Sequence, residues 1–465
     1  MLFSQASFYG RRGAVAGAIA LLASCGGGGG GNGGSFFPAA VQPQPATPVA
    51  EKRVIGGTVT GLVGSLVLQN NAGDDLKLTA DGKFSFASGV ASGSGYAVSV
   101  RTQPYWQYCT VAQGSGTVTA DVGDVAVVCK EAKAQVSTLA GSGRFGSIDG
   151  NGAAASFADP FGIVVDKDGR LIVSDAGAIP GGNRVRKVSA NGDVTTFAGN
   201  SASTSVNGNG AAASFNSLSG IALGPSGDLY AAEFIGNLIR RITPTAFVST
   251  FAGSGVPGSA NANGTNASFT GPIAMTIDGT GNLFVAELNT ARIRKITPAG
   301  DVTTLAGTGA FGFVNGTGTA ASFARPYGIA VDAAGNLFVA DSDNNAIRKV
   351  TPGGAVTTFA GTGTAGFADG AANVATFERP SGVAFDAVGN LYVADTGNSL
   401  LRKITPAGVV STLAGQPGVM GAQNGIGSAA TLKQPSGVAV GADGTIYVAD
   451  TLGNLIRKVT PVQAP

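Results

Sequence analysis

Two charged residues recur once in each copy of a repeat that fills most of this chain of 465 residues. One is an acid at the end of a short apolar run such as LYVAD, found as Asp175, Glu233, Glu287, Asp341, Asp395 and Asp450. The other is an arginine in the next run, found as Arg186, Arg240, Arg294, Arg348, Arg402 and Arg457. A circle of carboxylates could bind a cation, a sugar or a peptide. Alternatively, each acid holds its own turn or pairs with an arginine, and recurrence in every copy favours this structural role.

The chain contains no histidine, which removes the commonest general base and the commonest transition-metal ligand. The carboxylates could still hold a divalent cation in a channel, and no other cofactor is expected. Four segments fit G-x-G-x-x-G after an apolar run, at 141–146, 253–258, 307–312 and 361–366. A dinucleotide site needs a helix to begin there, whereas more Gly, Asn and Asp follow. We therefore interpret these segments as loops.

Positions where the copies differ are better candidates for a binding site than positions that all copies share. One such position lies near the start of the first apolar run and reads Phe161, Ser219, Ile273, Tyr327, Ser381 and Ser436. Phe161 and Tyr327 could stack on a sugar or another planar ligand. The first copy also inserts residues around 178–182. The alternative is that these are surface positions free to vary.

The repeat has a period of 54 residues, which indicates a repeat architecture. Its V-[ST]-T segments begin at Val136, Val194, Val248, Val302, Val356 and Val410. The apolar runs are short, rich in Val, Ile and Phe, and separated by Gly or Pro, so they predict strands. Each copy supplies four of them, as 382–413 illustrates, with a tight turn at 386–390. Four-stranded sheets repeated six times around an axis make an all-β, six-bladed β-propeller.

The phase of the repeats predicts how the propeller closes. The chain enters the repeats with VSTLAG at 136–141 and leaves them with LIRKVT at 455–460. In every complete copy R-[KR]-[IV]-[ST] precedes V[ST]T[LF]AG, so the last blade lacks its fourth strand. Pairing 136–141 with 455–460 would supply that strand and remove an unpaired edge.

The words P-x-G-[IV]-A-[VF]-D, GNL[YF]VAD and N-x-[IL]-R-K-[IV]-T-P resemble bacterial NHL-repeat proteins. The resemblance covers 136–461 and implies a six-bladed propeller. The Asn-His-Leu triplet that names the family is absent, and Asn237-Leu238-Ile239 and Asn454-Leu455-Ile456 stand in its place.

The N-terminal residues 1–25 resemble a bacterial lipoprotein signal. Arg11 and Arg12 precede a short apolar stretch, and Leu22-Ala23-Ser24-Cys25 resembles a lipobox. The resemblance implies that Cys25 is lipidated, and Gly26 after it favours the outer membrane. An ordinary signal peptide cleaved nearby is the alternative. Residues 26–52, rich in Gly and then Pro, are expected to be a flexible tether.

Residues 53–131 lie outside the repeat period and show short alternating runs typical of a small β-sandwich. Asp81-Gly82 predicts a hairpin between its flanking runs. Cys109 and Cys129 are expected to form a disulfide in an exported protein, with Trp106 packed on it in the core. The segment resembles small all-β modules of proteobacterial surface lipoproteins.

The charged residues nearly cancel, since 29 Lys and Arg against 27 Asp and Glu give a net charge of +2. This balance gives no electrostatic footprint for nucleic acid. We therefore expect a monomeric, membrane-anchored binding or scaffolding protein of the cell envelope, recognising a protein or glycan through its loop face. The alternatives are a six-bladed hydrolase or lactonase with a carboxylate-bound metal, and an extracytoplasmic sensor.

Overall fold

The computed structural model describes residues 51–177 and 182–463, and the residues from Glu51 onward form one compact unit. The expected signal, Cys25 and nearly all of the tether lie outside the described residues, as does most of the insertion at 178–182. Within the described ranges, no helix is long and apolar enough to cross a membrane. The fold is all-β, with short 3-10 turns: η1 (Gly152–Ala154), η2 (Gly210–Ala212), η3 (Gly264–Asn266), η4 (Gly318–Ala320), η5 (Ser342–Asn344), η6 (Gly427–Ala429) and η7 (Thr451–Gly453).

Two four-stranded sheets precede the repeats, with the orders β5-β2-β10-β8 and β4-β3-β7-β9, beside a β1-β6 pair. Their strands are β1 (Lys52–Arg53), β2 (Ile55–Thr60), β3 (Leu66–Asn70), β4 (Asp74–Leu78), β5 (Gly82–Ser85), β6 (Val90–Ala91), β7 (Gly95–Thr102), β8 (Gln107–Ala112), β9 (Ser115–Thr117) and β10 (Val122–Glu131). Both sheets bury side chains in one apolar cluster, including Ile55 of β2, Leu68 of β3 and Val127 of β10. The two sheets therefore share one core.

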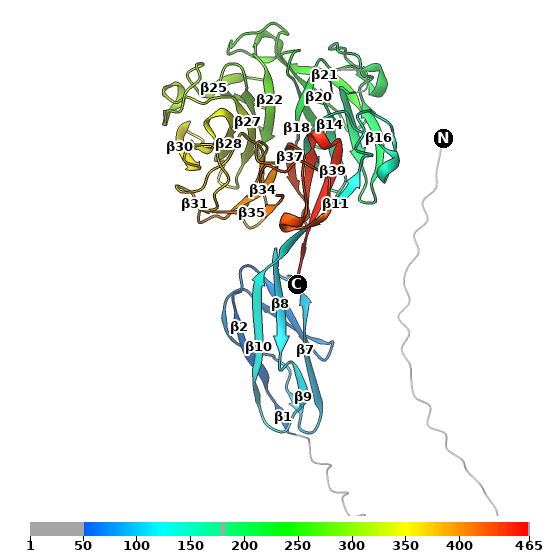
Figure 1. Ribbon diagram of the computed structural model, residues 1–465, viewed down its shortest axis with the longest axis vertical. Coiled ribbons are helices and arrows are strands. Elements are labelled where there is room, and N and C mark those ends of the chain that lie inside the picture. Colours follow the sequence, from blue (N-terminus) through cyan, green and yellow to red (C-terminus); the bar gives the residue numbers. More distant parts are fainter. Residues whose placement is uncertain (1–50, 178–181, 464–465) are drawn as a thin grey trace, which may run out of the picture. The chain divides into compact units, whose positions relative to one another are not determined.

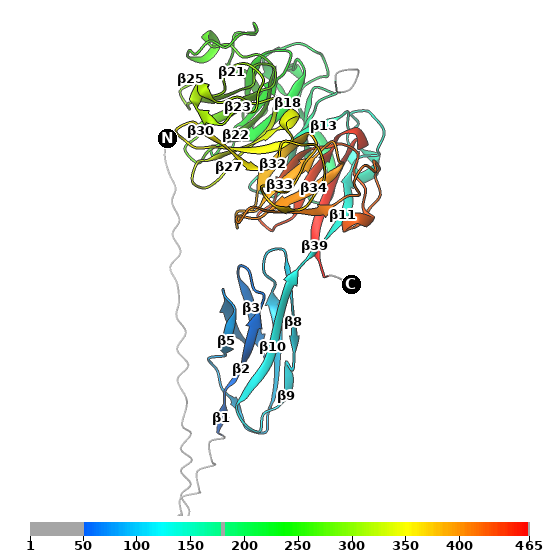
Figure 2. The ribbon, with the colours of Figure 1, turned by 60° about the vertical axis from the view of Figure 1, so that its left-hand side comes forward.

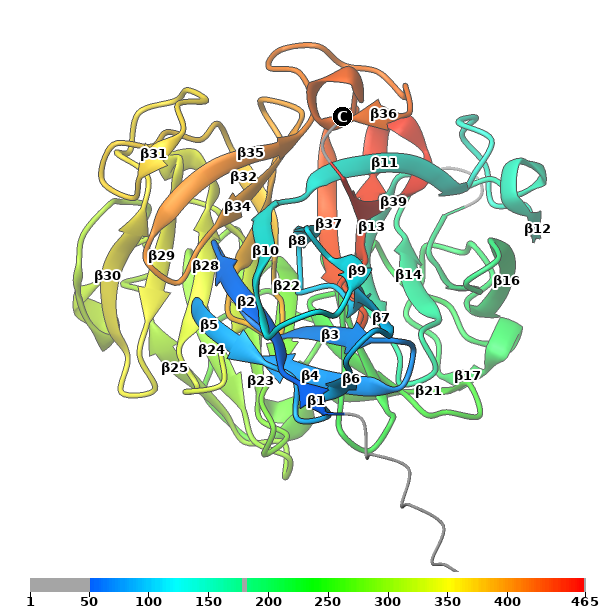
Figure 3. The same ribbon diagram turned by 90° about the horizontal axis from the view of Figure 1, so that it is seen from below.

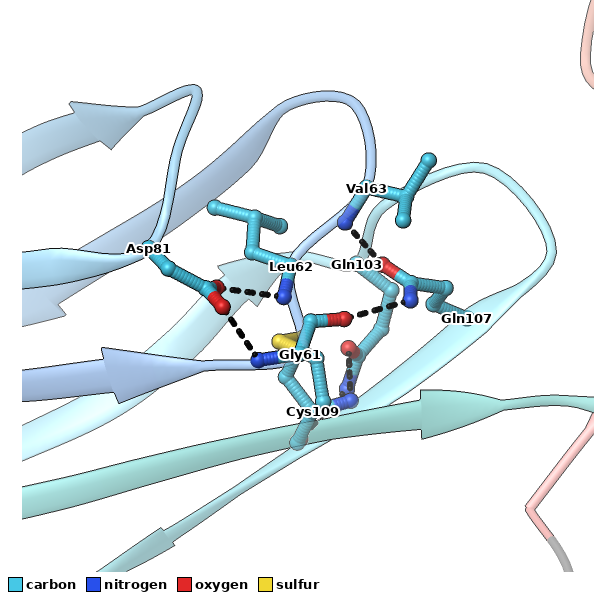
Figure 4. Close-up of a disulfide and its surroundings, with 8 residues drawn as sticks. Gly61, Leu62, Val63, Asp81, Gln103, Gln107 and Cys109 are labelled. Atoms are coloured by element: carbon cyan, nitrogen blue, oxygen red, sulfur yellow. Dashed lines mark hydrogen bonds between the residues drawn. A yellow bond between two sulfur atoms is a disulfide. The ribbon is translucent and has the colours of Figure 1, made fainter. Parts of the chain in front are cut away.

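The predicted hairpin at Asp81-Gly82 is wrong. The strands on either side of it, β4 and β5, belong to different sheets. Asp81 instead accepts hydrogen bonds from the backbone N–H groups of Gly61 and Leu62, at 2.9 and 2.7 Å (Figure 4). This turn crosses between the sheets because Leu78 and Phe84, on either side of it, both pack on the shared core.

The disulfide expected between Cys109 and Cys129 is present, and the two residues lie opposite each other in the β8-β10 pair. The side chain of Gln103 accepts from the N–H of Cys109 at 2.7 Å and donates to its carbonyl at 3.1 Å (Figure 4). Trp106 does not pack on the disulfide as expected. It lies in a separate cluster with Tyr392 of the repeats, and its indole N–H donates to the carbonyl of Gly444 at 2.9 Å.

The repeats form six antiparallel sheets, each with its first strand at one edge. The first three are β12 (Gly150–Asn151), β13 (Pro160–Val165), β14 (Leu171–Asp175), β15 (Arg184–Val188) and β16 (Asp193–Ala198); β17 (Gly208–Asn209), β18 (Leu218–Leu223), β19 (Leu229–Glu233), β20 (Leu238–Ile242) and β21 (Phe247–Ala252); and β22 (Pro272–Ile277), β23 (Leu283–Glu287), β24 (Arg292–Ile296) and β25 (Val302–Ala306).

The last three sheets follow the same order. They are β26 (Gly316–Thr317), β27 (Pro326–Val331), β28 (Leu337–Asp341), β29 (Ala346–Val350) and β30 (Ala355–Ala360); β31 (Gly370–Ala371), β32 (Pro380–Phe385), β33 (Leu391–Asp395), β34 (Leu400–Ile404) and β35 (Val409–Ala414); and β36 (Gly425–Ile426), β11 (Lys133–Ala140), β39 (Leu455–Val462), β38 (Ile446–Asp450) and β37 (Pro435–Val440). We call these sheets blades 1 to 6 in chain order. The first strand of a blade means the edge strand β13, β18, β22, β27, β32 or β37, and the second and third strands are the next two along the sheet.

The blades stand around a common axis (Figures 1 and 3). Their first strands contact one another in the closed cycle β13-β18-β22-β27-β32-β37. Glycine in the P-x-G motif makes this approach possible, because a Cβ at Gly328 or Gly382 would lie 2.0 Å from a carbonyl oxygen of the next blade. The arrangement is that of a β-propeller.

Blade 6 is completed by a strand from the beginning of the repeats. β10 leads directly into β11 (Figure 2), and β11 pairs antiparallel with β39, with Val136 opposite Val459. This is the pairing that the phase of the repeats predicts.

Local sequence explains the tight turn between the first two strands of a blade. In blade 5 the carboxylate of Asp386 accepts from the N–H groups of Val388 and Asn390, at 3.0 and 2.8 Å. Gly389 has a φ of 90°, a conformation that glycine adopts without steric cost. The second strand, β33, is then buried at every position because it is covered on both faces.

Candidate functional site

Each blade buries an ion pair between its recurring acid and its recurring arginine. In blade 5, Asp395 ends β33 and Arg402 lies in β34, and one guanidinium nitrogen stands 2.8 Å from a carboxylate oxygen. Both side chains are 0% exposed. The same guanidinium donates to the carbonyls of Thr376 and Ala368, both at 3.0 Å, and lies over the aromatic ring of Phe377.

The other blades repeat this arrangement with both partners fully buried. The pairs are Arg186–Asp175, Arg240–Glu233, Arg294–Glu287, Arg348–Asp341 and Arg457–Asp450. Each of the six carboxylates therefore pairs with its arginine inside a blade, which is the structural role that the sequence analysis gave as the alternative to ligand binding. Burial raises the pKa of Asp175, Asp341 and Asp395 to about 6, against the opposite effect of the paired guanidinium and the hydrogen bonds.

A second partner of each arginine was missed by sequence reasoning. It comes from the loop that precedes the first strand of the arginine's own blade, where a recurring Asp or Asn accepts from the same guanidinium. These residues are Asp149, Asn207, Asn261, Asn315, Asp369 and Asn424. The signal that could have found them is their own period, since each stands 33 to 37 residues before its arginine.

An asparagine before the third strand links several neighbouring blades. Asn183, Asn237, Asn345 and Asn454 have φ between 50° and 56°, a left-handed conformation that asparagine tolerates. The side-chain oxygen of Asn345 accepts from the N–H of Arg379 in the next blade at 3.0 Å. Asn454 of blade 6 accepts from Asp159 of blade 1 at 3.2 Å, so this link also spans the closing junction.

Phe161 and Tyr327 meet across the propeller axis. They lie on β13 and β27, which stand opposite each other in the cycle of first strands, and their ring centroids are 5.5 Å apart with planes inclined by 55°. Both are partly buried. Next to them a small cavity of about 70 Å³ lies on the axis, lined mostly by glycine and aliphatic residues of the first strands. The two aromatic rings therefore form a floor at this end of the axis.

A larger cavity of about 520 Å³ lies over this aromatic floor, and we call it the axial cavity. It is lined by Asp159, Phe161, Leu288, Arg325, Tyr327, Ser342, Asp343, Arg379, Ser381, Thr396, Gln434, Ser436, Thr451 and Leu452. Arg325 and Arg379 face the single carboxylate of Asp343 at 3.4 and 3.7 Å, and all three side chains are exposed to solvent. With Asp159, the lining carries two cations and two anions.

Hydroxyl groups around the axial cavity hold the blades together. Ser342 donates to the carbonyl of Pro380 at 2.6 Å and Thr396 to that of Pro435 at 2.7 Å. Thr451 donates to the carbonyl of Pro160 at 2.8 Å, across the closing junction. The walls of the cavity are therefore fixed by bonds between blades.

Metal-ligating side chains do not converge among the described residues. Nowhere in 51–177 and 182–463 do three His, Cys, Asp or Glu residues lie close enough together to hold a metal ion. The recurring carboxylates instead each serve their own arginine.

Comparison with known families identifies the repeats. The NHL repeat profile matches residues 323–350, 377–404 and 432–458. Each matched segment contains a recurring acid and its arginine. Blades 4, 5 and 6 thus match the NHL repeat.

Two curated proteins are similar to part of this chain. The chain is 29% identical to NHL repeat-containing protein 2 of Bos taurus over 340 residues, 64% of this chain and 46% of that protein. It is 41% identical to protein SUPPRESSOR OF QUENCHING 1, chloroplastic, of Arabidopsis thaliana over 95 residues, 20% of this chain and 9% of that protein. The chain thus spans less than half the length of these relatives.

Solved structures share the propeller fold. A Bacteroides thetaiotaomicron protein of unknown function superposes with a TM-score of 0.57 at 20% identity, covering 85% of this chain and 90% of that one. An auxiliary nutrient binding protein of the same organism gives 0.54 at 13% identity, covering 79% and 94%. At these identities the likeness concerns the fold.

The asparagine before the third strand and the apolar residue that follows it make the contacts of this position in the blades of this chain. At Asn237 and Asn454 the asparagine of that position supplies the bond to the next blade. The leucine that follows each asparagine is buried. The asparagine and the apolar residue thus carry the structural role.

Proposed function

We propose that this chain is a ligand-binding protein of the cell envelope, whose six-bladed NHL propeller takes a protein or glycan ligand in the axial cavity. The small β-sandwich-like domain at 53–131 would join the propeller to a tether lipidated at Cys25 in the outer membrane. The propeller would act as a monomer and without nucleic acid. One of the solved structures with this fold is named as a nutrient binding protein, which agrees with a binding role.

The observation that carries the proposal is the loss of symmetry at the axial cavity. The copies agree at the buried ion pairs, but at the cavity Phe161 and Tyr327 replace the small or aliphatic residues of the other blades. The volume of about 520 Å³ lies within the range of about 300–1,000 Å³ typical of ligand sites.

The chemistry of the lining fits a polar ligand with a flat face. The aromatic floor can stack on a sugar ring or a planar peptide group. Arg325 and Arg379 present planar donor groups, and Asp159 and the hydroxyl oxygens present acceptors, without net charge. Such a lining selects for hydrogen-bonding geometry more than for ligand charge.

A glycan array and a peptide pull-down with the full protein test the proposal, followed by calorimetry on any ligand found. Phe161→Ala and Tyr327→Ala are each expected to weaken binding by at least about tenfold, the equivalent of about 1.4 kcal/mol. Phe367→Ala is the matched control, because Phe367 is a 57% exposed aromatic residue outside the cavity. Binding that survives both cavity substitutions would contradict the assignment of this cavity.

A further inference from the structure

Blade 1 departs from the other blades at a position that faces the neighbouring blade. The second residue of the second strand is Tyr230, Phe284, Phe338, Tyr392 and Tyr447 in blades 2 to 6, and Ile172 in blade 1. Phe338, for example, packs in a cluster with Leu391 and Val393 of blade 5. Ile172 likewise lies in the cluster that blade 1 shares with Leu218 and Leu229 of blade 2. The junction between blades 1 and 2 is therefore built without the aromatic ring that every other junction has.

A cavity of about 470 Å³ lies at this junction, and we call it the lateral cavity. Its lining includes Ile172, Lys187, Phe197, Leu223, Leu229 and Pro244. In blades 2 and 4 the counterparts of Phe197 pack edge-on against the aromatic side chain of the second strand, with centroids 5.1 and 4.8 Å apart. In blade 1, Phe197 meets Ile172 instead, and the smaller side chain leaves the space open.

The lateral cavity also holds a lysine that differs from its counterparts. The ammonium of Lys187 lies 3.5 Å from the centroid of the Phe197 ring. In blades 3 and 4 the equivalent lysines lie over the aromatic side chain of the second strand, at 5.9 and 5.6 Å. The ammonium of Lys187 lies over Phe197 because Ile172, unlike Phe284 and Phe338, has no aromatic ring.

Lys187 carries a positive charge that no carboxylate in the described ranges neutralises by a direct ion pair. Of the equivalent residues, Arg241 and Lys403 pair with Asp228 and Glu131, whereas Lys295 and Lys349 lie over aromatic rings of the second strand. Asp166 lines the same cavity, but its carboxylate is taken by Arg170 at 2.8 Å. Burial lowers the pKa of Lys187, as expected of a cation that gains too little compensation for lost water.

We propose that the lateral cavity binds a small planar aromatic carboxylate, whose ring fills the space left at Ile172 and whose carboxylate pairs with Lys187. The ring would pack against Phe197 as Tyr230 and Phe338 pack against the counterparts of Phe197. The carboxylate would meet the ammonium in a partly buried place, where such a pair is worth more than at the surface. The proposal does not depend on the function assigned to the axial cavity.

Calorimetry or ligand-observed NMR on the full protein with benzoate and 1-naphthoate tests this proposal. Benzyl alcohol, a ring without charge, and cyclohexanecarboxylate, a charge without a planar ring, are the comparison compounds. We expect at least one aromatic carboxylate to bind at least about tenfold more tightly than either comparison compound, the equivalent of about 1.4 kcal/mol. No binding of either aromatic carboxylate, or equal binding of benzyl alcohol, would overturn the proposal.

Two substitutions locate the site. Ile172→Phe places in blade 1 the residue that blades 3 and 4 already have, so it should remove binding while keeping or raising the melting temperature. Lys187→Met should weaken binding at least about tenfold, whereas Lys349→Met, the same position in blade 4, should leave it unchanged. If Ile172→Phe does not fold, the two lysine variants decide. Equal binding by Lys187→Met and the wild type would refute the assignment.

Discussion

The buried arginine of each blade serves as a cross-link among four elements. Arg402 contacts the acid of β33, the loop carbonyls of Ala368 and Thr376, and the carboxylate of Asp369. Its long side chain lies over Phe377, a buried phenylalanine that recurs in blades 1 to 4 as Phe157, Phe215, Phe269 and Phe323. A buried pair of this kind need not add net stability over an apolar pair, but removing one partner leaves a buried charge.

Removing one partner of a blade's ion pair should therefore destabilise the propeller strongly. Arg402→Met and Asp395→Asn are each expected to lower the free energy of unfolding by about 3–5 kcal/mol. The double variant should lose less than the sum, because it leaves neither charge alone. Urea unfolding followed by circular dichroism measures these changes. Arg379→Met, at a side chain 64% exposed, is the control and should change stability by no more than about 0.5 kcal/mol.

At the scale of the element, neighbouring blades are joined by side-chain bonds as well as by packing. The asparagine before the third strand accepts from the N–H at the start of the next blade in blades 1, 2, 4 and 6. In blade 3 this position is Ala291, with the same left-handed φ of 49°. Its methyl group cannot accept a hydrogen bond, so this particular link is missing between blades 3 and 4.

Ala291→Asn should restore the missing link and stabilise the propeller. The gain expected from one hydrogen bond is about 0.5–1.5 kcal/mol, and asparagine also adopts left-handed φ more readily than alanine. The melting temperature of the full protein should rise. Asn345→Ala, the reverse change in blade 4, should lower it. A fall in melting temperature for Ala291→Asn would show that the buried position cannot accommodate the longer side chain.

The disulfide acts on the small sheets and not on the blades. Replacing Cys109 and Cys129 by serine is expected to cost about 3 kcal/mol, because the loop between them gains freedom when unfolded. Hydrogen exchange should show faster exchange of the β8 and β10 amides in this variant. The amides of β33 and β34 serve as the internal control and should keep their protection. Equal loss of protection in all four strands would contradict this localisation.

At the scale of the whole molecule, the fold depends on one junction that joins distant parts of the sequence. β11 gives blade 6 a strand next to β39, so that blade is assembled from both ends of the repeat region. Val136 at the centre of this junction is 0% exposed. Because the blades contact one another in a cycle, opening this junction would expose an edge of blade 6.

Val136→Asp should open the closing junction. A charge at this buried position lacks a partner, and the free energy of unfolding is expected to fall by about 3–5 kcal/mol. Thermal unfolding and limited proteolysis near residue 133 would detect the change. Lys133→Asp, an exposed position on the same strand, is the control and should behave like the wild type. A melting temperature unchanged by Val136→Asp would argue against β11 as the closing strand.

The sequence alone determined the blades, because their information is local. A period of 54 residues, short apolar runs rich in Val, Ile and Phe, and Gly-containing turns such as 386–390 specify each sheet. The phase of the first V-S-T segment was enough to predict the β11-β39 pair. The disulfide was predicted because, with Cys25 assigned to the lipobox, Cys109 and Cys129 are the two remaining cysteines of an exported chain. The hairpin at Asp81-Gly82 was predicted wrongly. Turn residues indicate that the chain changes direction, but they do not determine whether the two flanking strands pair with each other or with other strands.

Only the tertiary structure decided what the recurring and the divergent residues do. Aligned repeats show that Asp395 and Arg402 recur, but burial of both side chains, not recurrence, makes their contact an internal one. Phe161 and Tyr327 come from different repeats and meet only because the cycle of blades places β13 opposite β27. In the sequence, Ile172 is an ordinary apolar residue of a strand. That it lines a cavity follows only from the packing of blade 1 on blade 2. Contacts across the axis and between blades depend on closure of the whole circle, which no single repeat encodes.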